Sequence, residues 1–151
     1  MNAEVWVAGV TGIAATVEDL WRRQVSNWIP LVALVGGFVC QVMQHGWMGL
    51  LEALGGAVAG FLVFLVFYLL GGMGGGDVKL MAGFGALLGM HRILEGALWT
   101  AGIGGIFALA VIAFRAVVRL WKKPPPGEKE SEFIPYAPAI TLGVWLAMIP
   151  K

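Results

Sequence analysis

Acidic side chains are the main candidates for chemistry in this chain, which has nine of them beside one cysteine and two histidines. Six acids lie in a polar connector or at the predicted outer membrane border: Glu4, Glu52, Glu95, Glu128, Glu130 and Glu132. The other three are Glu18, Asp19 and Asp77. They lie where long apolar stretches end or begin at the opposite border of the predicted membrane. Ionisable groups are costly beside lipid, so an acid at such a border is a functional candidate.

Asp77 closes a glycine run, Gly71-Gly72-Met73-Gly74-Gly75-Gly76-Asp77. The five glycines of this run predict an unwound turn, because each costs about 1 kcal/mol relative to alanine inside a helix. Irregular backbone at membrane depth survives only beside protein or a watery cavity. Glycine also lets a second polypeptide backbone come close. The run lacks the Lys-Ser/Thr ending of a phosphate loop, which argues against a nucleotide site.

Asp19 ends the first apolar stretch, and the predicted topology places it on the same side of the membrane as Asp77. Two carboxyl groups that converge share a proton, and their titration belongs to the pair. One then acts as a base on water, while the other donates a proton to a carbonyl oxygen or a leaving amine. The two acids could therefore hydrolyse an amide without a metal or a cofactor.

Each acid also has a structural interpretation. Asp19 precedes Arg22 and Arg23 and could pair with an arginine, whereas Asp77 could cap the helix that follows it. Acids within membranes serve ion paths as well. Lys79 is two positions beyond Asp77, so the two side chains do not face each other on a helix. Its amine either reaches the membrane interface or tunes the acids and contacts substrate.

The charged residues divide the chain into long uncharged stretches that predict an all-α, polytopic membrane protein. We expect six membrane-spanning helices in a single domain, residues 1–151, with the spans close to residues 5–17, 24–51, 53–76, 80–90, 96–114 and 133–150. The fourth stretch is short for a span, so it either includes Asp77–Lys79 at one end and His91-Arg92 at the other, or is partly shielded by protein. Glycines spaced four residues apart, Gly56/Gly60 and Gly85/Gly89, predict close helix packing.

The distribution of lysine and arginine predicts that the N-terminus faces outward. In this orientation, eight of the 10 basic residues lie at cytoplasmic ends or loops: Arg22, Arg23, Lys79, Arg115, Arg119, Lys122, Lys123 and Lys129. Arg92 and Lys151 lie outside. Residues 121–133, with three prolines and several charges, are interpreted as a cytoplasmic connector.

Composition excludes several other classes of protein. Apolar residues make up 59% of the chain and charged residues 13%, too little charge for a water-facing surface. A net charge of +1, with no separate basic stripe, argues against nucleic-acid binding. The single cysteine, Cys40, excludes a disulfide framework and a multi-cysteine zinc site. It lies in an apolar stretch and is expected to act as a small core residue.

Three blocks of sequence, in order along the chain, resemble the type IV prepilin peptidases, which are membrane aspartic peptidases of the Gly-x-Gly-Asp type. Residues 74–80 (Gly-Gly-Gly-Asp-Val-Lys-Leu) resemble their Gly-x-Gly-Asp-x-Lys-Leu signature. Residues 19–28 resemble the segment that begins with their first catalytic aspartate. Residues 134–140 (Ile-Pro-Tyr-Ala-Pro-Ala-Ile) resemble the Ile-Pro-Tyr-Gly-Pro-Ala block at the start of their last helix.

The resemblance implies an endopeptidase of the bacterial inner membrane, with its active site facing the cytoplasm. Such enzymes remove short basic leaders from type IV prepilins and pseudopilins, whose apolar helix would enter from the lipid bilayer. Carried over, Asp19 and Asp77 are the catalytic pair, and Gly74 and Gly76 shape the loop beside Asp77. Glu18 could help to attract a basic leader.

The chain also departs from the family pattern. Val25-Ser26-Asn27 stands where Ile-Pro-Asn is usual, and Ala137 replaces a usual glycine. Cys40 stands alone, whereas larger relatives carry paired cysteine motifs and also methylate the new N-terminus. The chain therefore resembles the short, peptidase-only form that serves tight-adherence (Flp) pili, without methyltransferase activity. Two other functions stay open: a small ion- or proton-coupled transporter or channel component, and a non-catalytic subunit of a pilus or secretion assembly.

Overall fold

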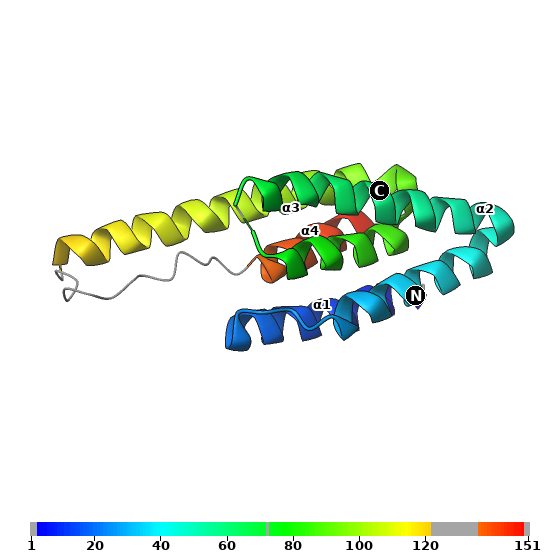
Figure 1. Cartoon of the computed structure of the whole chain (residues 1–151), viewed down its shortest axis with the longest axis horizontal. Coiled ribbons are helices and arrows are strands. Elements are labelled where there is room, and N and C mark those ends of the chain that lie inside the picture. Colours follow the sequence, from blue (N-terminus) through cyan, green and yellow to red (C-terminus); the bar gives the residue numbers. More distant parts are fainter. Residues whose placement is uncertain (1–2, 72, 122–135, 150–151) are drawn as a thin grey trace.

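The protein is all-α in the computed structural model, which describes residues 3–71, 73–121 and 136–149. These residues form four helices, shown in Figure 1: α1 (Ala3–Arg22), α2 (Trp28–Leu69), α3 (Gly75–Trp121) and α4 (Ala137–Met148). The all-α part of the predicted fold class is thus confirmed. Residues 122–133 of the predicted connector lie outside the described residues.

The two long helices are each broken by a glycine. Gly46 in α2 has φ 59° and ψ −135°, and Gly89 in α3 has φ 71° and ψ 174°. Glycine reaches positive φ at little cost because it lacks a Cβ. A Cβ added at Gly49 would collide with the carbonyl of Gln41, so α2 doubles back on itself. Figure 1 shows both α2 and α3 as helical hairpins.

These breaks lie a few residues from where the sequence predicted them. The expected boundaries were Glu52 and residues 91–95, whereas the chain reverses at Gly46 and Gly89. Charges indicate where a chain leaves an apolar environment, but the reversal itself needs a residue that tolerates positive φ. In the part of the chain that the structure describes, two helices are long and apolar enough to span a membrane, Trp28–Leu69 and Gly75–Phe114. The six membrane spans stay a prediction.

The first arm of α3, residues 75–88, occupies the centre of the bundle. Phe84, Leu80 and Met81 on this arm are fully buried, which agrees with shielding by protein, one of the two alternatives for the short fourth stretch. The helix also includes Asp77–Lys79, as the other alternative required at this end. In Figure 1 this arm lies among α1, α4 and the other helical arms. Asp77 is therefore attached to the most enclosed segment of the molecule.

Small residues allow this central packing. A Cβ at Gly56 would collide with the carbonyl oxygen of Gly85, and a Cβ at Gly85 with that of Gly56. A Cβ at Gly60 would lie 2.6 Å from the carbonyl oxygen of Met81. Helix backbones approach this closely only where neither carries a side chain. The predicted role of the spaced glycines in close packing is confirmed at these positions.

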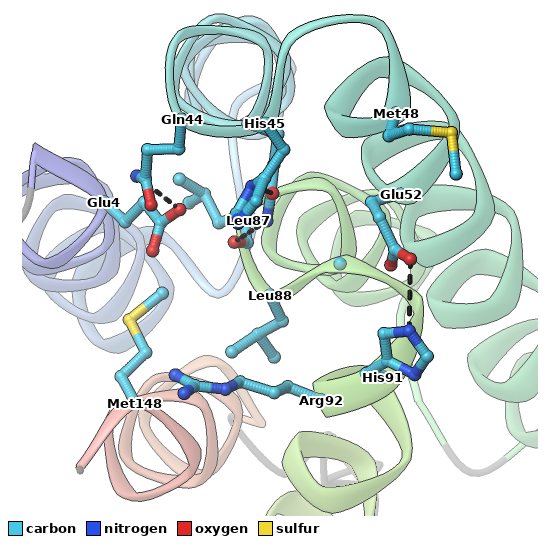
Figure 2. Close-up of a pocket in the computed structure, with 12 residues that line it drawn as sticks. Glu4, Gln44, His45, Met48, Glu52, Leu87, Leu88, His91, Arg92 and Met148 are labelled. Carbon is cyan, nitrogen blue, oxygen red and sulfur yellow. Dashed lines mark hydrogen bonds and ion pairs between the residues drawn. The ribbon is translucent and has the colours of Figure 1, made fainter.

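Polar residues gather at both ends of the bundle. One end contains the end of α1, the start of α2, the glycine loop and the start of α4 (Figure 1). Figure 2 shows the other end, where a pocket of about 480 Å³ is lined by residues that include Glu4, Gln44, Glu52, His91 and Arg92. The outer faces of the helices between these ends are apolar, with Val10, Ile13 and Leu98 exposed. This is the surface pattern of a protein embedded in lipid.

Candidate active site

Asp19 lies in the last turn of α1 and is only 1% exposed. Its Oδ2 accepts a hydrogen bond of 3.1 Å from the backbone N–H of Ala137, the first residue of α4. The first amides of a helix have no partner within that helix and carry the positive end of its dipole, so they favour a carboxylate. Asp19 thus joins two helices that are far apart in the sequence.

Asp77 is the third residue of α3 and is 2% exposed. Its Oδ2 accepts a hydrogen bond of 3.3 Å from the N–H of Gly74. Its own N–H donates to the carbonyl of Gly74 at 3.1 Å. An acid at this position that reaches back to the amide before the helix is one half of a capping box. The structural interpretation of Asp77 as a cap is therefore correct, and it leaves a second function open.

Both aspartates line one cavity of about 210 Å³. The other residues that line this acid cavity come from the turn after α1 and from the glycine loop: Arg23, Gln24, Val25, Gly74, Gly75 and Gly76. Several water molecules fit in this volume, since one occupies about 30 Å³ in the liquid.

The glycine loop is shorter than the sequence predicted. Helix α3 already begins at Gly75, so Gly75, Gly76 and Asp77 are helical rather than unwound. The cap made by Asp77 helps to offset the helix-breaking tendency of the glycines before it. Gly71, with φ 76°, turns the chain out of α2. A Cβ at Gly76 would lie 3.2 Å from the Cβ of Val25, so the absence of a side chain lets the turn after α1 approach α3.

Glu18 holds that turn in place, a role that the sequence did not reveal. Its carboxylate accepts hydrogen bonds from the backbone N–H of Ser26 at 2.8 Å and from the Ser26 hydroxyl at 2.5 Å. Arg22 lies 3.9 Å from the same carboxylate. Ser26 is one of the positions that depart from the family pattern. Its hydroxyl makes one of the hydrogen bonds that connect this turn to α1. No local spacing rule connects residues eight apart across a turn, so this contact had no sequence signal.

Lys79 lies next to the acid cavity but is not among the described residues that line it. Its Nζ donates a hydrogen bond of 2.9 Å to Oδ1 of Asn27, the residue before α2. It therefore links the start of α3 to the turn after α1. Of the five predicted site residues, Asp19, Asp77, Gly74 and Gly76 converge on the cavity, and Lys79 supports one of its walls.

Within the described ranges, no group of three or more His, Cys, Asp and Glu side chains is placed to hold a metal ion. The acid cavity offers two carboxylates and backbone amides. Such a set suits proton transfer to and from a water molecule.

Residues 6–109, which include both aspartates, match the type IV leader peptidase family. The chain belongs to this family.

Curated relatives extend the match to most of the length of this chain. A prepilin leader peptidase/N-methyltransferase of Aeromonas salmonicida (strain A449) is 31% identical over 144 residues, 91% of this chain and 45% of the relative. A protein of the same name from Bacillus subtilis (strain 168) is 35% identical over 96 residues, 62% of this chain and 34% of the relative. The chain thus spans less than half the length of these curated relatives. No solved structure matches it.

Proposed function

We propose that the chain is a membrane aspartic endopeptidase that removes leader peptides from type IV prepilins and pseudopilins. Asp19 and Asp77 are its catalytic pair. The observation that carries the proposal is that two acids, 1% and 2% exposed on different helices, line the same cavity. The family match and the names of the relatives support the choice of substrate.

In this mechanism a water molecule in the acid cavity is the nucleophile. Two neighbouring carboxyl groups do not both ionise freely, so one is a carboxylate while the other keeps a proton. The carboxylate takes a proton from the water molecule while the oxygen of that water bonds to the scissile carbonyl carbon. The protonated acid donates its proton to the carbonyl oxygen, which gives a tetrahedral intermediate. The first acid then passes the proton that it took from the water to the leaving amine, the C–N bond breaks, and the second acid regains its proton as the new carboxylic acid forms. Either aspartate can begin as the base, because titration belongs to the pair.

The backbone amides of Ala137 and Gly74 orient the pair. Each donates to Oδ2 of one aspartate, so each carboxyl group has one oxygen held by the start of a helix. The scissile amide must be unwound before attack, since a helical carbonyl is already hydrogen-bonded. The glycines beside Asp77 leave room for that extended backbone to approach.

The proposal includes the membrane topology. We place the acid cavity at the cytoplasmic face of the inner membrane, with six spans and the N-terminus outside. Arg22, Arg23 and Lys79 lie beside the residues of the acid end, which supports this orientation by the positive-inside rule. We also propose Flp-type prepilins as substrates and no methyl transfer, on the resemblance to the short form of the family.

The decisive experiment compares the purified wild-type protein with Asp19→Asn and Asp77→Asn in cleavage of an Flp-type prepilin. Each variant should lose about 10²–10⁴-fold in rate, the usual contribution of a general acid or base. Glu52→Gln is the matched control, because Glu52 also accepts a backbone N–H, that of Met90 at 3.0 Å, but at the far end of the bundle. It should stay within about twofold of wild type.

Circular dichroism and size-exclusion chromatography should show that all variants remain folded. Equal processing by both aspartate variants would reject the proposal and favour an assembly subunit. A proton flux that depends on both aspartates, without cleavage by the wild type, would favour the transporter. Incubation with S-adenosylmethionine tests the methyl-transfer part, and a methylated product would reject it.

A further inference from the structure

A further cavity, of about 190 Å³, lies between α2 and α3 and does not include either aspartate. Its walls are two aromatic side chains from the return arm of α2 and small residues from the second arm of α3: Phe64, Phe67, Ala101, Gly104, Gly105 and Ala108. Beyond it, Ile106 and Leu109 on the same arm are 72% and 68% exposed. The cavity, hereafter the α2–α3 groove, is thus an apolar depression on a surface of membrane-protein type.

The groove ends at the two chain segments that hold the catalytic acids. Met73 lines the groove, and the next residue, Gly74, lines the acid cavity and binds Asp77. Tyr136 also lines the groove, and the next residue, Ala137, donates its N–H to Asp19. The groove and the acid cavity therefore lie on either side of the same two segments. An occupant that leaves the groove past Met73 and Tyr136 arrives at the acids.

The wall contributed by α3 suits a helix. Ala101, Gly104, Gly105 and Ala108 follow the i, i+3, i+4, i+7 spacing of one helical face. Small residues on such a face let a second helix come close. A Cβ at Gly105 would meet nothing within 4 Å, so this part of the groove is open.

One residue at the edge of the groove carries a buried hydroxyl. Thr100 also lines the groove and is 3% exposed. Its Oγ1 has no hydrogen-bond partner, and among the described residues no other buried side-chain oxygen or nitrogen is unpaired in this way. A buried polar group that is left unpaired is unfavourable. This Oγ1 lies against Gly143 of α4, where an added Cβ would collide with it, so the hydroxyl belongs to the contact between α3 and α4 and does not identify the occupant of the groove.

We propose that the α2–α3 groove seats the apolar helix of the prepilin substrate and directs its leader-proximal end past Met73 and Tyr136 to Asp19 and Asp77. The inference rests on the proposed function and adds the place where the substrate's helix binds. The groove is too small to enclose a helix, so it takes the side chains of one helical face. This is the helix-in-groove mode of recognition.

The test fills the groove and compares the result with a matched change on the opposite face of the same helix. Ala108→Leu places a larger side chain in the groove, and Ala110→Leu makes the same change at an exposed position two residues away. With an Flp-type prepilin that carries its complete apolar helix, Ala108→Leu should raise KM by about tenfold or more, with a smaller effect on kcat. Ala110→Leu should leave both parameters within twofold of wild type. Gly105→Leu, at the open position, is the second groove variant if Ala108→Leu does not fold.

A photo-crosslinking amino acid at position 108 or 110, in the Asp77→Asn background, gives a readout that needs no cleavage. We expect an adduct with the prepilin helix from position 108 and none from position 110. Equal KM values for the two leucine variants, or adducts at 108 only with lipid or with a second copy of this chain, would overturn the proposal. If the wild-type protein cleaves nothing, the proposed function fails, and the crosslink still decides whether the groove binds the helix.

Discussion

The two ends of the helical bundle each contain acids and a cavity, but they use the acids differently. At the far end, Glu4 accepts a hydrogen bond of 2.8 Å from Gln44, and Glu52 lies 3.2 Å from His91 (Figure 2). The Glu52 side chain is 32% exposed and that of His91 is 89% exposed. At the other end, both aspartates are almost completely buried, and each is held by an amide at the start of a helix.

The larger cavity is thus not the better candidate for catalysis. The far-end pocket, about 480 Å³, has more than twice the volume of the acid cavity, about 210 Å³. Its acids pair with side chains near solvent, and Glu52 also binds the N–H of Met90, next to the break at Gly89. Those contacts complete a broken helix. Two buried acids that line one cavity are different, because carboxyl groups in such an arrangement can share a proton.

The largest expected effect is on the rate of cleavage, which should fall when the acids of one end are changed but not when those of the other end are. The double variant Asp19→Asn/Asp77→Asn should lose no more activity than the stronger single variant, about 10²–10⁴-fold, because residues that act as a unit are not additive. Single-turnover cleavage of a prepilin measures this. The corresponding far-end double variant, Glu4→Gln/Glu52→Gln, should keep its activity. Multiplicative losses in the aspartate double variant would show that the two acids act independently.

A substitution at the far-end break should affect stability rather than chemistry. Gly89→Ala forces a side chain to adopt φ 71° and should lower the free energy of unfolding by about 1–3 kcal/mol. Gly102→Ala is the control, since Gly102 is helical and its Cβ would meet nothing within 4 Å. It should be neutral or stabilising by up to about 1 kcal/mol. Thermal unfolding in detergent measures both, and a loss of kcat in folded Gly89→Ala would break the separation between the ends.

The turn after α1 should respond more mildly. Ser26→Ala removes the hydroxyl bond to Glu18 and should cost about 1 kcal/mol of stability, with a smaller loss of cleavage. Glu18→Gln keeps an acceptor for Ser26 but removes the charge. If Glu18 also attracts a basic leader, this variant should raise KM at low salt and lose that effect at high salt. Unchanged cleavage by Glu18→Gln at low salt would leave Glu18 with the structural role alone.

The smallest effect is expected at His91. Its pair with Glu52 is exposed, and exposed ion pairs contribute between zero and about 1 kcal/mol. His91→Gln should therefore change the midpoint of thermal unfolding by little and leave cleavage unchanged. Scanning calorimetry and the prepilin assay test this together. A large loss of cleavage would mean that the far-end pocket contributes to function after all.

Much of the candidate site follows from local patterns in the sequence. The glycine run identified Asp77, and its place at the start of a helix follows from the same residues. Asp19 was identified because few acids border the apolar stretches. The amide of Ala137 as its partner could not be predicted, because the residues lie 118 positions apart and no local rule connects them. The position of the α2 break was missed for a related reason, since Gly46 is one of 23 glycines and its positive φ depends on how the two arms pack.

By itself, the sequence determined that this chain is helical and apolar and that two of its acids are suited to proton transfer. Those properties depend on residue type and short spacing, which act within a few turns of helix. The tertiary structure alone decided that the two acids share a cavity, that helix-start amides hold them, and that a groove leads to them. Such convergence depends on the reversals at Gly46 and Gly89 and on the close contact of Gly56 with Gly85, which bring distant segments together.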